Sequence, residues 1–139
     1  MSIDKFAAIG SSVVVAAAVV VGLVLAGSPT ENRLQRLDKT RRYDLVNITS
    51  SIDTYSADKK TLPTALPDLV NGRRLSRLPS DPITDIPYTY NVIDETHYEL
   101  CATFSTASVD DGGDDFWAHP KGHHCFTFEV RTYENASLL

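Results

Sequence analysis

Two cysteines, Cys101 and Cys125, carry the clearest chemistry in this sequence. Each lies in a segment that alternates apolar and polar residues, so we expect both on neighbouring strands. Neighbouring strands bring such a pair within the Cα separation that a disulfide tolerates. The sequence therefore predicts a Cys101–Cys125 disulfide that closes a loop of about 24 residues and indicates an oxidising compartment. Two inert thiols and metal ligation are the alternatives.

The metal alternative depends on histidines near the second cysteine. The candidate ligands are His119, His123, His124 and Cys125, with Cys101 on the neighbouring strand. His119 and His123 have the spacing of metal ligands only if their segment is helical, and Pro120 and Gly122 disfavour a helix there. The sequence also lacks Cys-x-x-Cys and His-Glu-x-x-His. A loop with exposed histidines is therefore the favoured interpretation.

An acidic loop precedes these histidines and has the composition of a calcium site. Its carboxylates are Asp110, Asp111, Asp114 and Asp115, separated by Gly112 and Gly113. Carboxylate oxygens suit Ca²⁺, and glycine permits the tight turn that wraps a hard cation. The spacing is not that of an EF-hand, and a solvated acidic turn is the favoured alternative. Phe116 and Trp117 follow the loop and are expected to anchor it to the sheet.

Motifs for enzyme chemistry are absent from the sequence. It has no Gly-x-Ser-x-Gly, no Ser-x-x-Lys and no P-loop. Arg73, Arg74 and Arg77 form a basic cluster, but no glycine-rich phosphate loop accompanies it, so a solvated loop is favoured over an anion site. A formal net charge of −5 disfavours nucleic acid as a partner. We therefore assign no catalytic or cofactor-binding residue and predict a non-enzymatic protein.

The elements that position these residues follow a long apolar segment. In this chain of 139 residues, the stretch from Phe6 to Gly27 has no charged side chain and is rich in Val and Ala. As a helix it is about 33 Å long, which is enough to cross a hydrocarbon core of about 30 Å. We predict a short tail over 1–5 and an uncleaved transmembrane helix over 6–27, with a cleaved signal peptide as the alternative.

Two signals conflict on the side of the membrane that the domain occupies. Five cationic residues follow the span closely: Arg33, Arg36, Lys39, Arg41 and Arg42. The positive-inside rule would place them in the cytoplasm, but long domains translocate largely regardless of charge. Because the predicted disulfide requires an oxidising compartment, we favour an extracytoplasmic domain.

An amphipathic helix is predicted over 28–57. Its apolar stripe has three- and four-residue spacings and consists of Leu34, Leu37, Leu45, Ile48, Ile52 and Tyr55. Arg41 fills the one gap in this stripe. Such a helix is expected to pack one face on a small core.

The region 58–130 is predicted to contain a short helix, loops and an antiparallel sheet. A polar turn over 58–63 leads to the short helix at 64–70. The segment 78–87 holds three prolines and is therefore a turn region rather than an internal strand or a helix. Period-two alternation predicts three strands, at 88–93, 97–104 and 124–130. The polar tail 131–139 is expected to fray.

This order of elements resembles a type IV pilin, and most closely the major pseudopilin of type II secretion. The family's Tyr-x-x-Asp step and following Leu-Pro are matched by Tyr55, Asp58 and Leu62-Pro63. Its later proline and tyrosine run is matched by Leu78-Pro79-Ser80-Asp81-Pro82 and Pro87-Tyr88-Thr89-Tyr90. Tyr98-Glu99-Leu100 lies where the family's second strand lies. The stretch from Asp81 to Phe104 is also similar to C-terminal domains of uncharacterised bacterial membrane proteins.

The resemblance implies an α+β, pilin-like fold, in which a transmembrane helix continues into an amphipathic helix packed on a small three-stranded antiparallel sheet. It also implies a calcium-binding loop between the last strands, where the acidic loop lies. The chain departs from a pilin precursor at Met1-Ser2-Ile3-Asp4-Lys5-Phe6, which lacks the glycine before the phenylalanine and the glutamate that follows in the apolar helix. A pilin-like fold on a permanent anchor is therefore expected, rather than a polymerising subunit.

These observations together predict a membrane-anchored, pilin- or pseudopilin-like structural or interaction subunit of a cell-envelope assembly. We expect a single-pass protein of the inner (cytoplasmic) membrane whose C-terminal domain is periplasmic. Its expected partners are the membrane and other protein subunits of the assembly. No cofactor is expected. The alternative is a small metal- or ligand-binding extracytoplasmic module that binds Ca²⁺ through Asp110, Asp111, Asp114 and Asp115.

Overall fold

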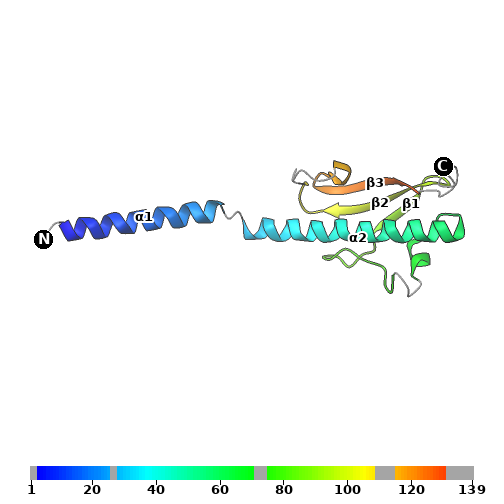
Figure 1. Cartoon of the computed structure of the whole chain (residues 1–139), viewed down its shortest axis with the longest axis horizontal. Coiled ribbons are helices and arrows are strands. Elements are labelled where there is room, and N and C mark those ends of the chain that lie inside the picture. Colours follow the sequence, from blue (N-terminus) through cyan, green and yellow to red (C-terminus); the bar gives the residue numbers. More distant parts are fainter. Residues whose placement is uncertain (1–2, 26–27, 71–74, 109–114, 131–139) are drawn as a thin grey trace, which may run out of the picture. The chain divides into compact units, whose positions relative to one another are not determined.

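The structure is a computed structural model that describes residues 3–25, 28–70, 75–108 and 115–130. The long helices are α1 (Ile3–Leu25) and α2 (Pro29–Lys59), and the strands are β1 (Thr89–Val92), β2 (His97–Phe104) and β3 (Gly122–Glu129). Two short 3₁₀ helices are η1 (Leu66–Leu69), before β1, and η2 (Asp115–Trp117), between β2 and β3 (Figure 1). The chain divides into two compact units, residues 1–33 and 34–139.

The first unit contains α1, which has no charged side chain from Phe6 to its end at Leu25. The large side chains described between Val13 and Val24 are 55–74% exposed. Apolar surface of this extent is unfavourable in water, because its transfer to an apolar medium lowers the free energy. Within the described ranges, one helix is long and apolar enough to cross a membrane, and it lies near the N-terminus. The predicted span over 6–27 ends at Ala26 and Gly27, which lie outside the described residues.

Helix α2 begins and ends at residues whose backbone suits those positions. Pro29 occupies the first helical position, where its missing N–H costs nothing and its fixed φ favours the helix. The helix ends at Lys59, and Lys60 follows with a φ of 60° while its N–H donates to the Ser56 carbonyl oxygen at 2.8 Å. This left-handed residue is a common helix stop. The helix therefore runs two residues beyond the predicted end at 57.

The three strands form one antiparallel sheet in the order β1-β2-β3. Leu100 pairs with Tyr90 on β1 and with Phe126 on β3, so these three side chains face the same side of the sheet. The β1–β2 turn is held by Asp94, whose carboxylate accepts hydrogen bonds from the N–H groups of Thr96 and His97 at 2.8 and 2.7 Å. Strand β2 has the predicted bounds, whereas β3 begins two residues earlier than predicted.

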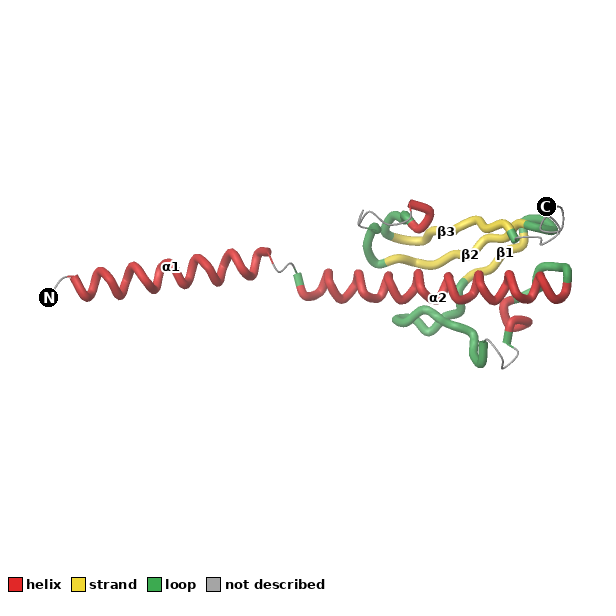
Figure 2. The backbone as a smooth tube through the Cα atoms, viewed as in Figure 1, coloured by secondary structure: helices red, strands yellow, loops and turns green. Residues whose placement is uncertain are grey.

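The core lies between α2 and the sheet. Leu45, Ile48 and Ile52 on α2 are fully buried and belong to the same hydrophobic cluster as the sheet residues Leu100 and Phe104. Figure 2 shows η1 and the later part of the connection to β1 on the opposite side of α2 from the sheet. The predicted stripe therefore faces the core from Leu45 to Tyr55, whereas Leu34 and Leu37 are half-buried outside the cluster. The α+β class is confirmed.

The connection from α2 to β1 contributes to the core more than its sequence suggests. Leu62 and Pro63, in the predicted polar turn, are buried, and Leu66 and Leu69 of η1 join the same cluster. The Asp68 carboxylate accepts hydrogen bonds from the N–H groups of Thr64 and Ala65, at 3.1 and 3.0 Å, which stabilises the start of η1. The predicted helix over 64–70 is thus one short 3₁₀ turn.

Candidate functional site

Cys101 and Cys125 form a disulfide, as the sequence predicts. The two residues lie directly opposite each other on β2 and β3. Their neighbours Leu100 and Phe126 face the core, so strand alternation places the disulfide on the other face of the sheet. The bridge therefore fastens β3 to β2 covalently without occupying core volume.

The histidines near Cys125 are separated by their packing. The ring of His119 stacks on Phe104 with centroids 3.6 Å apart, and burial lowers the pKa of this imidazole. The ring of His124 makes an edge contact with Phe126, with centroids 4.8 Å apart. His123 is exposed but lies on β3, and His119 and His124 are half-buried, so the expectation of a loop with exposed histidines is wrong. The contact of His119 with Phe104 had no signal in the sequence.

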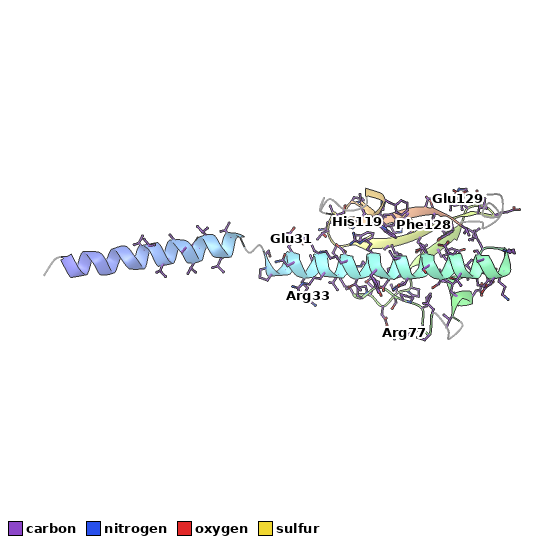
Figure 3. All side chains as sticks on the ribbon, viewed as in Figure 1. Glu31, Arg33, Arg77, His119, Phe128 and Glu129 are labelled. Atoms are coloured by element: carbon purple, nitrogen blue, oxygen red, sulfur yellow. A yellow bond between two sulfur atoms is a disulfide. The ribbon has the colours of Figure 1, made fainter. Side chains whose placement is uncertain are left out.

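The acidic loop that is predicted to bind calcium and the predicted basic cluster lie mostly outside the described residues. This applies to Asp110, Asp111 and Asp114, and also to Arg73 and Arg74. Asp115 begins η2, but its side chain is not among those described. Arg77 is exposed (Figure 3). Calcium coordination by the acidic loop therefore stays a prediction.

The aromatic pair after the acidic loop anchors η2 to the sheet, as predicted. Phe116 contacts Phe128 with ring centroids 5.3 Å apart, and Trp117 contacts Phe126 at 5.0 Å. Phe116 and Trp117 also contact each other edge to face. Such aromatic contacts stabilise beyond the area they bury. They hold the end of the long β2–β3 connection against β3.

The arginine in the gap of the α2 stripe is the centre of a buried ionic network. Arg41 is only 3% exposed, and its Nη1 donates to Asp38 Oδ1 at 2.6 Å. Its Nε donates to Asp81 Oδ2 at 2.6 Å, and its Nη1 also reaches Ser105 Oγ at 2.8 Å. One side chain thus joins α2 to the proline-rich turn and to the segment after β2.

The carboxylates of this network are held by further donors. Asp38 accepts hydrogen bonds from the N–H groups of Ser105 and Thr106, both at 2.8 Å, and from the Thr106 hydroxyl at 2.7 Å. Asp81 Oδ1 accepts from the N–H groups of Ile83 and Thr84 at 2.9 and 3.0 Å. Because these donors satisfy the oxygens, the charges are tolerated in a buried site.

The same contacts set the protonation of the network. Burial acts to raise the pKa of Asp81, but the hydrogen bonds from Arg41, Ile83 and Thr84 outweigh it and lower the pKa to about 2. Burial likewise opposes ionisation of Asp38, and the donors of Thr106, Ser105 and Arg41 hold its pKa below the usual value. Both sets of contacts therefore favour the charged carboxylate.

Acid is expected to weaken the domain through Asp81. A folded-state pKa below the unfolded value of about 3.9 stabilises the fold above that pH, and the stabilisation is lost as the pH falls toward about 2. Urea unfolding at pH 6, 4 and 2.5 should show this fall, and Asp81→Asn should show a smaller one. Asp85→Asn, an exposed position in the same turn, should keep the wild-type profile. Equal pH dependence of Asp81→Asn and the wild type would contradict this assignment.

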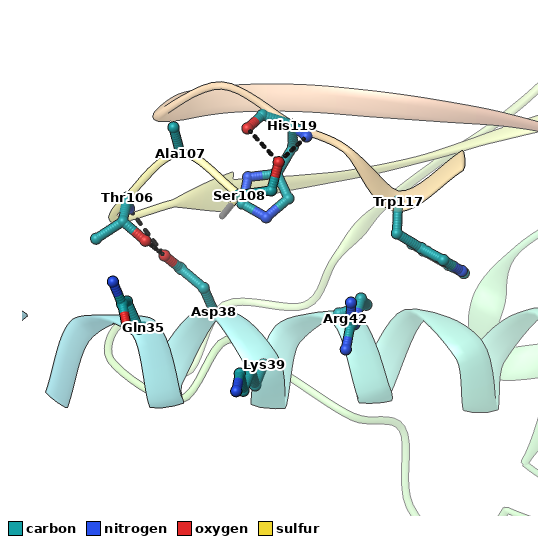
Figure 4. Close-up of a pocket in the computed structure, with 9 residues that line it drawn as sticks. All are labelled: Gln35, Asp38, Lys39, Arg42, Thr106, Ala107, Ser108, Trp117 and His119. Carbon is teal, nitrogen blue, oxygen red and sulfur yellow. Dashed lines mark hydrogen bonds between the residues drawn. The ribbon is translucent and has the colours of Figure 1, made fainter. Parts of the chain in front are cut away.

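A cavity of about 230 Å³ lies beside this network, between α2 and the segment that surrounds the acidic loop (Figure 4). The residues that line it are Gln35, Asp38, Lys39, Arg42, Thr106, Ala107, Ser108, Trp117 and His119. Lys39 and Arg42 have no hydrogen-bond or ion-pair partner among the described residues. Two cations, an indole and an imidazole in this lining can contact a small anionic group, and the Asp38 carboxylate in the same lining is paired with Arg41. Sequence reasoning missed this cavity, because both cations look like solvent-facing charges on a helix.

No family model, curated protein or solved structure matches this chain. The resemblance to pseudopilins therefore rests on the short motifs of the sequence alone.

Proposed function

We propose that this chain is a membrane-anchored, pilin-like structural or interaction subunit of a cell-envelope assembly, without enzymatic activity. The observation that carries the proposal is the succession of an apolar helix and an amphipathic one. Helix α1 exposes apolar side chains, and α2 begins four residues after it ends and supplies the buried stripe of the α+β domain. This arrangement suits a module that a membrane holds at one end.

The pilin-like part of the proposal is supported by the order of the domain's elements. A long helix, a connection through Leu62-Pro63, a short helical turn and a three-stranded antiparallel sheet follow one another. The Leu78–Tyr90 segment, which carries the longest motif of the resemblance, leads directly into β1. Tyr88 in this segment donates its hydroxyl to Asp44 of α2 at 2.8 Å, so the motif is fastened to the helix.

The disulfide supports a place for the domain outside the cytoplasm. Disulfides persist in the periplasm and are rare in the cytosol. The two cysteines are bonded to each other, and no free cysteine remains in the chain. We accordingly place α1 in the inner membrane and the domain in the periplasm.

The exposed surface of α2 is the contact region that we assign to other subunits. Tyr43 and Val46 are 66% and 41% exposed, and they lie one helical turn apart on the same face. Tyr43 also borders an open groove of about 580 Å³, which continues along Asn47 and Ser50. Aromatic residues are enriched at the centre of protein interfaces, where they carry much of the binding energy.

In-cell photocrosslinking tests the proposal. A photoreactive amino acid at Tyr43 of the full-length chain should give adducts of discrete mass, and mass spectrometry should identify the second component as another envelope protein or a second copy. Glu95, exposed in the β1–β2 turn, is the matched control and should give no such adduct. Absence of an adduct at Tyr43, or the same adducts at both positions, would contradict an interaction role for α2.

A small ligand-binding module is the second candidate, and the cavity beside Lys39 and Arg42 favours it. Calcium binding by such a module can be tested separately, through the acidic loop. If Asp110, Asp111, Asp114 and Asp115 hold Ca²⁺, the ion should raise Tm, and the rise should grow with the logarithm of its concentration above Kd; a chelator should reverse it. An unchanged Tm would contradict calcium binding by the acidic loop.

A further inference from the structure

Three metal-ligating side chains meet on the face of the sheet that lies away from the core. The sulfur atoms of Cys101 and Cys125 and a ring nitrogen of His123 lie within 4.8 Å of one another. Cys101 and Cys125 are opposite partners in the register, and His123 lies two residues before Cys125 on β3. Because residues two apart on a strand face the same side, this convergence follows from the sheet itself.

We propose that Cys101, Cys125 and His123 form a redox-gated metal site, which binds Zn²⁺ when the disulfide is reduced. Two thiolates and one imidazole are a ligand set that Zn²⁺ uses in proteins, with a water molecule in the fourth position. His123 is exposed, so solvent reaches that fourth position. This inference stands apart from the proposed function, since it requires neither a pilin-like fold nor a partner subunit.

The geometry needs only a local adjustment of side chains. Zn–S and Zn–N bonds of about 2.3 and 2.0–2.1 Å in a tetrahedral site place the ligand atoms roughly 3.5–3.8 Å apart. The three atoms already lie within 4.8 Å of one another. Rotation of the cysteine side chains would separate the two sulfurs after reduction, while the register of β2 and β3 stays in place.

The gating reaction is a thiol–disulfide exchange followed by metal binding. A dithiol attacks through a thiolate, becomes a cyclic disulfide itself, and leaves Cys101 and Cys125 as two thiols. Zn²⁺ then displaces the two thiol protons, which pass to solvent, and binds neutral His123 through a ring nitrogen. In the reverse direction a small-molecule disulfide accepts the two electrons by thiol–disulfide exchange and leaves as two thiols, so Cys101 and Cys125 rejoin, two ligands are lost and the ion is released. Disulfide and metal are therefore mutually exclusive states of one site.

The structure distinguishes His123 from the other histidines that the sequence offers. His119 stacks on Phe104, and His124 contacts Phe126, whose ring belongs to the core. His124 pairs with Ala102 and so lies on the opposite face from the cysteines. It is thus a matched control, one residue from His123 and equally able to bind a metal in isolation.

Zinc binding by the full-length protein in detergent tests the proposal. A water-soluble phosphine reduces the disulfide, with one water consumed, one phosphine oxide formed and two thiols produced. Competition with a chromophoric chelator should then show one Zn²⁺ per reduced chain and none per oxidised chain. Co²⁺ as a probe should give a thiolate-to-cobalt charge-transfer band. His123→Ala should weaken Zn²⁺ binding at least about tenfold, whereas His124→Ala should retain wild-type affinity.

The proposal is overturned if the reduced chain binds no Zn²⁺, or if His123→Ala binds it as tightly as the wild type. Reduction also removes the stabilisation of the bridge, so circular dichroism is recorded in each state. If the reduced chain unfolds, we expect stoichiometric Zn²⁺ to restore the folded spectrum, because metal binding is coupled to folding. Failure of Zn²⁺ to restore it would equally overturn the proposal.

Discussion

Replacement of Arg41 by alanine is expected to lower the free energy of unfolding by about 3–5 kcal/mol, because it removes one partner of a buried ion pair and leaves the other charged. Arg41 donates to Asp38 and Asp81 at 2.6 Å each, and it is 3% exposed. The variant would leave Asp38 and Asp81 beside each other without their shared cation. It would also release the proline-rich turn and the segment after β2 from α2.

Urea unfolding of the full-length protein in detergent, followed by circular dichroism, measures this effect. Arg42→Ala is the matched control, since Arg42 is the next residue on the same helix and is exposed. Its unfolding free energy should stay within about 0.5 kcal/mol of the wild type. Arg41→Lys should fall between the two, because an ammonium group cannot reproduce the fork of guanidinium donors. A loss below about 1 kcal/mol for Arg41→Ala would contradict a structural role for the network.

Removal of the disulfide is expected to lower the free energy of unfolding by about 3–4 kcal/mol. The bridge joins residues separated by 24 positions, so its loss restores the conformational freedom of that loop to the unfolded chain. The variant Cys101→Ser/Cys125→Ser keeps the size of both side chains and the register of β2 and β3.

Denaturant midpoints with and without reductant measure the disulfide's contribution. Reductant should lower the midpoint of the wild type to near that of the double serine variant, and it should leave the variant itself unchanged. Metal chelator is included in both, so that zinc binding by the reduced thiols does not mask the loss. A wild-type midpoint that reductant does not move would contradict a stabilising bridge.

Much of the fold could be predicted from periodicity. The helical stripe of α2 and the alternation of β2 are continuous signals, and both elements lie close to their predicted places. The start of β3 was missed because Gly122 and His123 carry no apolar alternation, and their strand conformation follows from pairing with Phe104 and Thr103. The burial of Leu62 and Pro63 was missed for a related reason, since a tertiary contact decides it.

The same distinction between local sequence signals and tertiary contacts applies to the candidate site. The disulfide followed from two predicted strands, and the anchoring role of Phe116 and Trp117 followed from their place after a loop. Arg41 was recognised as an interruption of the stripe, but its partners were not. Asp81 and Ser105 lie 40 and 64 residues away along the chain, and no local pattern relates them to a helix residue. Local signals predict elements, whereas the contacts between distant segments need the fold.

Measurement of the domain's compartment is the most direct test, because the proposed function requires a disulfide-bonded domain that α1 holds outside the cytoplasm. Two reporters fused at Leu139 measure it in intact cells: a phosphatase that is active only after it forms disulfides, and a fluorescent protein that matures only in the cytosol. We expect an active phosphatase and a dark fluorescent fusion, both in the membrane fraction. Bright fluorescence with an inactive phosphatase would contradict it.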